Sequence, residues 1–305
     1  MSPAKARPEG SRAKYTVRLT GLPSDRVPLV AMECQLPASA ARGGASQSVR
    51  VRIAATGDLH IRGGEGPSAL PGIFGLADKA DLLLVAGDLT ENGRLLEAEA
   101  AAEMLAAARL PVVAVLGNHD LRSLRRVAFR RVLERRGIEI LDGRATVVRL
   151  PNGSRVGIAG TVGSGGGFWP HEGPDAIHTR TLKRLAIRAR RECDALERAL
   201  MSLDADMRIA TMHFAPTTTT LGREPLAKYW MLGNCELGVV LDRRGPDLVV
   251  HGHAHLGTLN GCTPGGVPVR NVALPVVGCI HLEVLEKKIR GHVRTAEPVS
   301  LMRWQ

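Results

Sequence analysis

Short apolar runs alternate with longer stretches of helical pattern along most of the chain. The runs 51–56, 81–86 and 111–116 are almost entirely apolar, which is typical of strands buried on both faces of a parallel sheet. The Ala- and Leu-rich stretch 94–110 and the stretch 121–136 have the length and composition of helices. This alternation of strand and helix indicates an α/β fold.

The second half of the chain continues this pattern. We expect a glycine-rich loop at 163–170 and a long helix at 179–203. Further strands are predicted at 145–150, 155–160, 207–212, 247–250, 267–271, 276–285 and 293–301. Residues 1–49 mix Pro, Gly, Ala, Ser and Arg with little periodicity, so we expect a basic, disordered N-terminal extension there. Residues 50–305 are expected to form one domain.

The composition is that of a soluble globular protein. Of the 305 residues, 44% are hydrophobic and 23% are charged. No stretch approaches the roughly 20 apolar residues needed to cross a bilayer, and the N-terminus lacks the apolar run of a secretory signal. The five cysteines are scattered without a Cys-x-x-Cys pair, which argues against a disulfide framework. We therefore expect a cytoplasmic protein without a membrane span.

The net charge of +11 arises from two segments. Residues 1–50 contain eight basic and three acidic side chains, and residues 121–136 contain seven basic side chains and one acidic one. These segments account for the whole excess, so the rest of the chain is not generally basic. A solvated charged face explains both segments better than polyanion binding does.

Five polar motifs follow apolar strands, and their side chains are of the types that bind divalent metals. They are Asp58-Leu59-His60, Gly87-Asp88, Gly117-Asn118-His119-Asp120, His213 and Gly252-His253-Ala254-His255. In open α/β sheets, sites form where loops leave the carboxyl ends of strands, so we expect the motifs to meet at one rim. Two carboxylates, one carboxamide and four imidazoles suit two metal ions that share a carboxylate.

In this order the motifs resemble those of the calcineurin-like metallophosphoesterase superfamily, over roughly residues 51–255. The resemblance implies a four-layer α/β/β/α fold, in which two packed mixed sheets are flanked by helices. It implies a first metal held by Asp58, His60, Asp88 and His255, and a second held by Asp88, Asn118, His213 and His253. Such mixed donors accept manganese, iron or zinc.

The resemblance gives His119 a role other than metal binding. It would lie at the phosphate and either protonate the leaving oxygen or stabilise charge on the phosphorane. Members of the family often pair this histidine with an acidic residue, for which Asp120 or Glu91 could serve. Some phosphoprotein phosphatases of the superfamily have a phosphate-binding arginine near the second motif, where this chain has Asn92.

The implied function is hydrolysis of a phosphomonoester or phosphodiester, by in-line attack of a hydroxide that bridges the two metals. The chain contains no Gly-x-Ser-x-Gly elbow and no P-loop, which removes two rival mechanisms. Cyclic nucleotides, nucleotides, phospholipid headgroups and phosphoproteins all stay open as substrates, and the substrate-binding residues and oligomeric state are not indicated.

Two alternatives to a small-molecule hydrolase stay open. A DNA nuclease of the same superfamily would use the basic segments, but only 50 residues follow His255 and they resemble closing strands rather than an extra domain. Nucleic acid is therefore a possible partner that we do not favour. A non-catalytic scaffold on the same fold would be expected to lose ligands, whereas this chain keeps all seven as well as His119.

Other polar and aromatic residues have less defined expectations. Phe168 and Trp169 in the glycine-rich loop are expected to cover core, or alternatively to form a flap over the metals. The hydroxyls of 217–220 could donate to phosphate oxygens or belong to a solvated loop. We expect His251 to support the ligands from behind or to be structural, and His171 and His178 to be loop residues. Trp230 and Asn234 stay undecided.

Overall fold

The computed structural model describes residues 46–64, 66, 69–172 and 180–290. Most of the N-terminal extension, His178 and the strand predicted at 293–301 lie outside these residues. No helix in the described ranges is both long and apolar enough to span a bilayer.

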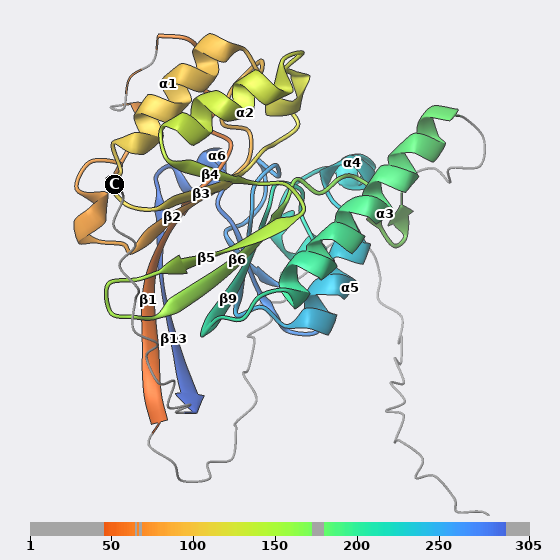
Figure 1. The fold of residues 1–305 in the computed structure, drawn as a ribbon. Coiled ribbons are helices and arrows are strands. Elements are labelled where there is room, and N and C mark those ends of the chain that lie inside the picture. The colour runs from red at the N-terminus through yellow and green to blue at the C-terminus, as the bar shows by residue number, and fades with distance from the viewer. Residues whose placement is uncertain (1–45, 65, 67–68, 173–179, 291–305) are drawn as a thin grey trace, which may run out of the picture. The chain divides into compact units, whose positions relative to one another are not determined.

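Two mixed sheets form the centre of the fold (Figure 1). The first has the order β13 (His281–Arg290), β1 (Ser46–Thr56), β2 (Leu82–Ala86), β3 (Val112–Val115) and β4 (Ile138–Leu141), with only β13 antiparallel to its neighbour. The second has the order β11 (Asn260–Cys262), β12 (Pro268–Asn271), β10 (Leu248–His251), β9 (Met207–Met212), β6 (Arg155–Thr161) and β5 (Arg144–Arg149). Its two edge strands are antiparallel to their neighbours.

Helices cover the outer face of each sheet. Helices α1 (Leu95–Ala106) and α2 (Arg126–Arg135) pack on the first sheet, and α3 (Arg180–Met201) and α5 (Cys235–Arg244) pack on the second (Figure 1). Shorter elements are β7 (Gly167–Phe168), β8 (His171–Glu172), α4 (Tyr229–Leu232), α6 (Leu274–Val277) and the 3-10 helices Leu76–Asp78, Asp120–Arg122, Thr218–Thr220 and Leu226–Lys228. The four-layer α/β/β/α prediction is thereby confirmed.

Strand β2 shows how the apolar runs produce these layers. All five of its residues are buried. Because successive side chains point to opposite faces, Leu83 and Val85 pack toward α1 and α2, whereas Leu82 and Leu84 pack between the two sheets. A third apolar cluster joins the second sheet to α3 and α5. Two-sided burial therefore explains why the run has no polar alternation.

Several predicted elements differ from the observed ones. The strand predicted at 276–285 is instead α6 followed by β13, because Pro275 favours a helix start and Gly278, with φ of 76°, ends it. The helix predicted at 121–136 begins only at Arg126, after the 3-10 helix Asp120–Arg122. Strand β1 begins at Ser46, earlier than the predicted 51. Strand β4 and helix α5 were not predicted.

Candidate metal centre

Five strand ends position the motif side chains at one rim. The residues are Asp58 and His60 after β1, Asp88 after β2, Asn118 after β3, His213 after β9, and His253 and His255 after β10. Strands β1 to β3 belong to the first sheet, whereas β9 and β10 belong to the second. The site is therefore built jointly by both sheets, at the carboxyl ends of their parallel strands.

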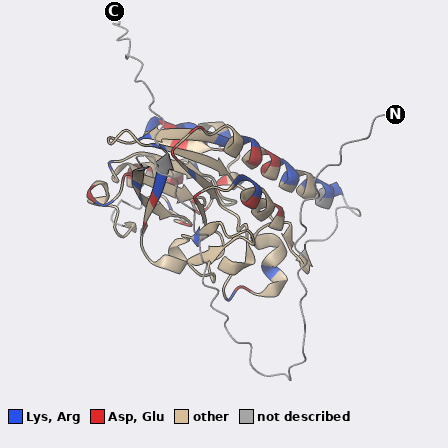
Figure 2. Ribbon diagram, turned by 90° about the horizontal axis from the view of Figure 1, so that it is seen from below, with Lys and Arg blue, Asp and Glu red and all other residues tan. Residues whose placement is uncertain are grey.

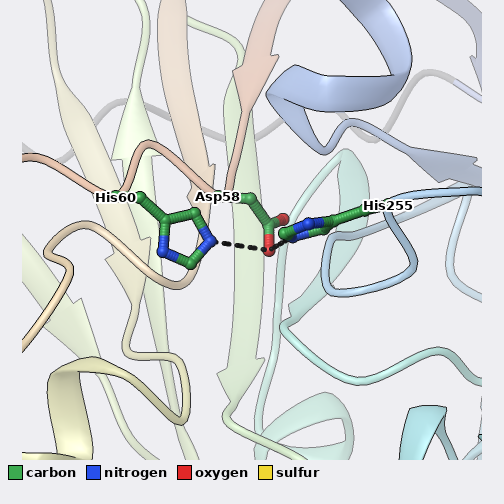
Figure 3. Close-up of side chains that lie close together, drawn as sticks. All are labelled: Asp58, His60 and His255. Atoms are coloured by element: carbon green, nitrogen blue, oxygen red, sulfur yellow. Dashed lines mark hydrogen bonds and ion pairs between the residues drawn. The ribbon is translucent and has the colours of Figure 1, made fainter.

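The side chains form two donor groups. Asp58, His60 and His255 make the first group, in which each residue offers a ligand atom within 4.8 Å of the others. His255 Nε2 lies 2.9 Å and His60 Nε2 4.0 Å from Asp58 Oδ1, and Figure 3 shows both rings directed at that carboxylate. The second group is made by Asp88, His213 and His253, also within 4.8 Å.

Asp88 lies between the two groups. Its Oδ2 is 3.9 Å from His60 Nε2 on one side and 3.3 Å from His213 Nε2 on the other. Asn118 joins the second group, because its Oδ1 lies 2.9 Å from His213 Nε2. All seven expected ligands are thus brought together, with Asp88 in the position from which one carboxylate can contact two ions.

The backbone at these residues is strained. Within the described part of the chain, five non-glycine residues have a positive φ, and four of them are Asp58, His60, Asp88 and His253, at 56°, 47°, 49° and 69°. Such conformations cost of order 1–3 kcal/mol each and persist where the surrounding structure enforces them, often at functional sites. The fold therefore holds four expected ligands in conformations that the chain would not adopt unaided.

The motif glycines allow the ligands to approach the backbone. A Cβ on Gly117 would lie 2.1 Å from Asp88 Oδ1, and one on Gly252 would lie 2.2 Å from Asp58 Oδ2. Both distances are shorter than any real contact of a carbon atom. Glycine is therefore required there for space, so that the two carboxylates can be packed into the rim.

Ring nitrogens provide an independent test of whether the residues suit metal ions. Neither ring nitrogen of His60 has a hydrogen-bond partner in the described structure, although both are buried. Each ring of the second group instead has one nitrogen bonded to a backbone carbonyl, His213 Nδ1 to Ala86 at 2.9 Å and His253 Nε2 to Met231 at 3.2 Å. Such bonds orient metal-binding histidines, so the donor set fits two ions.

Burial and charge set the pKa values around the site. Burial alone would raise the pKa of Asp58 and Asp88, but the neighbouring histidines outweigh it, and both pKa values fall below the usual range. Burial would lower the pKa of His213, yet the Asp88 carboxylate raises it to about 9. Burial, reinforced by the charge on His213, lowers the pKa of His253 to about 3.

His119 lies beside the donor groups with its ring held from two sides. Its Nδ1 lies 2.8 Å from the Glu91 carbonyl oxygen and 3.6 Å from Glu91 Oε1. Its Nε2 lies 3.1 Å from Arg122 Nη2 and 4.0 Å from Asp88 Oδ2. Its ring is also within reach of a metal, since His119, His60 and Asp88 offer ligand atoms within 4.8 Å of one another.

Of the two acidic candidates, Glu91 is the one that contacts His119. Asp120 is buried and accepts hydrogen bonds from Gly117 N at 2.9 Å, Leu89 N at 3.1 Å and Thr90 N at 2.9 Å. Burial raises the pKa of Asp120 to about 6 despite these bonds. Asp120 therefore ties the loop after β2 to the loop after β3, rather than contacting the His119 ring.

A cleft of about 970 Å³ adjoins the centre, lined there by Asn118, His253 and His255. Its walls include the glycines of 163–166, the α3 segment 185–190 and Trp230. Phe168 is buried against Tyr229, with ring centroids 6.2 Å apart, and Trp169 is 81% exposed and is not part of the lining. The aromatic flap hypothesis therefore gains no support, and the aromatic side chains Phe214 and Trp230 line the cleft instead.

The other polar candidates are engaged within the protein. Thr217 Oγ1 and Thr219 Oγ1 donate to the Cys262 carbonyl at 3.0 and 2.8 Å. Thr220 Oγ1 lies 2.8 Å from Nε2 of His251, which is fully buried. These hydroxyls therefore support the fold around the last motif.

Arg122 and the cleft-lining side chains are the residues that sequence reasoning missed. Arg122 lies two residues after Asp120 in an arginine-rich segment, where nothing distinguishes it from its neighbours. Its proximity to the third motif is the only signal that could have identified it. The cleft residues Leu185 and Met231 come from segments distant in the sequence, so no local pattern groups them.

Three solved structures are similar to this chain at low sequence identity. Among solved structures, the TT1561 protein of Thermus thermophilus is 17% identical with a TM-score of 0.49, and the match covers 79% of this chain and 99% of that one. A candidate 5'-nucleotidase of Staphylococcus aureus, in complex with α-ketoglutarate, is 15% identical with a TM-score of 0.46, covering 73% and 48%. The sulfate thiohydrolase SoxB of Thermus thermophilus is 14% identical with a TM-score of 0.43, covering 78% and 56%.

No curated protein matches the sequence significantly. The family model of the calcineurin-like phosphoesterases, however, matches residues 51–257, which is more than half of the chain and spans every motif of the site. As the motifs predicted, the chain belongs to the calcineurin-like phosphoesterase family.

Proposed function

We propose that the protein is a metal-dependent hydrolase of phosphomonoesters or phosphodiesters. The observation that carries this proposal is the position of Asp88 between two histidine-containing donor groups. Asp58, His60 and His255 would complete the first metal site, and Asn118, His213 and His253 the second. When bound, two such ions lower the pKa of water and neutralise charge on a phosphate.

His119 is proposed to handle the proton of the leaving oxygen. With Nδ1–H donated to the Glu91 carbonyl, Nε2 points toward the rim and accepts from Arg122. A phosphate oxygen that arrives there would compete for the Arg122 donor, so that Nε2 can instead bind a proton from water and pass it to the leaving oxygen. The carbonyl of Glu91 thus fixes the ring orientation, and Arg122 binds the anion.

Metal-dependent hydrolysis tests the proposal directly. The full chain would be incubated with Mn²⁺, Fe²⁺ or Zn²⁺ and either 4-nitrophenyl phosphate or bis(4-nitrophenyl) phosphate. We expect metal-dependent hydrolysis of at least one of these esters. The rate should fall at least about 100-fold in Asp88→Asn, because losing a bridging ligand should cost more than the 10–100-fold typical of groups that only orient ligands. Glu103→Gln, on the exposed face of α1, is the matched control.

The scaffold hypothesis makes the opposite prediction, namely no metal-stimulated hydrolysis of either ester. The nuclease hypothesis predicts steeply salt-dependent DNA binding. Figure 2 shows both basic and acidic positions on the described ribbon, although residues 180–191 of α3 carry six basic side chains and no acidic one. Other arginines are paired with carboxylates, as in Arg130–Glu134 and Arg244–Glu197. Because part of the basic charge is neutralised in this way, we rank the nuclease second.

A further inference from the structure

The cleft beside the metal centre is much larger than a phosphate group requires. Its volume of about 970 Å³ lies at the upper end of the roughly 300–1,000 Å³ typical of small-molecule pockets. Asn118, His253 and His255 are three of the 23 residues that line it. A phosphate held at the metals would therefore leave most of the cleft to the rest of the substrate.

Partly exposed apolar side chains from three segments line this cleft. They are Leu185 and Ile187 of α3, Trp230 and Met231 of α4, and Leu256 after the last motif, with exposed fractions of 48%, 48%, 38%, 44% and 46%. Fifteen large hydrophobic side chains are exposed in the described structure, and one third of them line this cleft. Apolar surface gathered in this way marks a binding site rather than chance exposure.

Helix α3 also presents part of its apolar face to the cleft. One apolar stripe of the helix, Ala189, Cys193, Leu196 and Leu200, is buried against the second sheet. Leu185 continues this stripe by one further turn, since residues four apart lie on one helix face. At Leu185 the sheet no longer covers the helix, and the side chain lines the cleft instead. The cleft is therefore lined by the continuation of the α3 face that is buried in the core further along the helix.

Polar side chains of the lining are already bonded within the protein. Ser164 Oγ donates to the Gly165 carbonyl at 3.1 Å, Asn234 Oδ1 accepts from Glu236 N at 2.8 Å, and Glu224 Oε1 accepts from Leu256 N at 2.8 Å. These three side chains are therefore less available to recognise the edge of a nucleobase or a sugar. Apart from its charged side chains, the cleft offers an occupant mainly hydrophobic contact.

The charged residues of the lining favour an anionic molecule. Arg188, Arg190 and Lys228 contribute three positive charges, against the two carboxylates Glu224 and Glu236, which leaves a net charge of +1. Arg188 Nε also lies 3.7 Å from Glu192 Oε1. An apolar cleft with a small positive excess beside a candidate metal centre is complementary to an anionic amphiphile. Because the cleft has walls on several sides, it suits a single molecule better than the flat surface of a bilayer.

We propose that the cleft binds an aliphatic chain of the substrate, so that the substrate is a phosphoester carrying an alkyl group of several carbons. The phosphate lies at the metal centre, and the chain extends along Leu185, Trp230 and Met231. This inference rests on the proposed phosphoester hydrolase function and names the substrate class of that same site.

A series of alkylphosphonates tests the substrate class without requiring turnover. Methyl-, butyl- and octylphosphonate would be titrated into the manganese-loaded full chain below their micelle concentrations, with affinities measured by calorimetry. Octylphosphonate is expected to bind about 100-fold more tightly than methylphosphonate, the effect of three to four buried methylenes at roughly fourfold each. Equal affinity along the series, or tighter binding of adenosine 5'-monophosphate than of octylphosphonate, would overturn the inference.

Two variants of α3 test whether the preference for long alkyl chains depends on the cleft. Leu185→Asn is expected to reduce the octyl-to-methyl affinity ratio by about tenfold, because it places an amide where the chain would pack. Met201→Asn is the matched control, since Met201 is 62% exposed on the same helix and about 24 Å away along its axis. An unchanged ratio in Leu185→Asn would contradict the inference.

These measurements separate failure of the substrate class from failure of the hydrolase function. If 4-nitrophenyl phosphate is hydrolysed but the phosphonates bind equally, only the substrate class is wrong. If neither aryl ester is hydrolysed and no phosphonate binds the metal-loaded protein, the proposed function is wrong, and the inference fails with it.

Discussion

Arg122 brings a guanidinium to the edge of His119 that faces Asp88. Its Nη2 lies 3.1 Å from His119 Nε2, and its Nη1 donates to the Glu91 carbonyl at 3.2 Å. A charge-assisted bond to phosphate contributes about 1.5–3 kcal/mol, so we expect Arg122→Ala to reduce kcat/KM for an aryl phosphate by roughly 10- to 100-fold. Steady-state kinetics and inhibition by inorganic phosphate would measure this effect.

The kinetic constants distinguish binding of phosphate from mere support of His119. Weaker inhibition by phosphate in Arg122→Ala, partly restored in Arg122→Lys, is the expected result, because lysine keeps the charge but lacks the paired donors. A fall in kcat with unchanged phosphate inhibition would show that Arg122 only orients His119. Arg131→Ala, on the exposed face of α2, is the control.

Residues differ in how far the sequence predicts their roles. Asp88 and His253 could be predicted as ligands because their motifs directly follow apolar strands, so topology alone brings them to one rim. Their positive φ values, 49° and 69°, could not be predicted from the sequence, in which only the neighbouring glycines hint at them. Arg122 could not be predicted, because its contact with His119 depends on how the chain turns between the third motif and α2.

At the level of elements, a partly buried ion pair joins the two sheets. Arg270 on β12 donates through Nε and Nη2 to both carboxylate oxygens of Glu283 on β13, at 2.8 and 2.9 Å. Both side chains are less than one-fifth exposed. Glu283→Gln leaves the Arg270 charge without its partner, so we expect the free energy of unfolding at pH 7 to fall by about 2 kcal/mol in urea titrations.

The stabilisation of the folded protein by this ion pair depends on pH. Burial would raise the pKa of Glu283, but the hydrogen bonds from His281 and Arg270 outweigh it and lower the pKa to about 2. The stabilisation is therefore complete above the unfolded value of roughly 4.3 and is lost as the pH falls toward 2. Glu283→Gln should lack this acid-sensitive part. Glu286→Gln, from an exposed pair on the same strand, should behave like the parent protein.

Elements were predictable in proportion to the strength of their local pattern. Strand β9 matches its prediction at both ends, 207–212, because all of its residues except Arg208 are buried. Strand β4 has only four residues and helix α5 only ten, which is too short for periodicity to be decisive. The pairing of β1 with β13 joins the first and last described strands, and no local pattern specifies such a partner.

At the level of the whole molecule, the candidate metal centre connects the two sheets. Asp58, His60, Asp88 and Asn118 follow strands of the first sheet, and the three remaining proposed ligands follow strands of the second. Ions that bind only the folded protein stabilise it by RT ln(1 + [metal]/Kd), about 2.7 kcal/mol at a hundredfold excess over Kd. Removal of metal by a chelator should therefore lower the Tm, and the loss should be absent in Asp88→Asn.

Metal binding should also release a proton from His213. Its Nδ1 faces the Ala86 carbonyl, and its Nε2 faces both Asn118 Oδ1 and Asp88 Oδ2, so the ring can donate from both nitrogens when no metal is bound. The Asp88 carboxylate raises the pKa of His213 to about 9, although burial opposes the shift. A metal at Nε2 must displace this proton, so its apparent affinity should rise about tenfold per pH unit from pH 7 to about 9 and then level off. Calorimetric titration of Mn²⁺ in buffers of different ionisation enthalpy would report about one proton released at pH 7.5, and an affinity independent of pH across this range would contradict the assignment of His213 as a ligand.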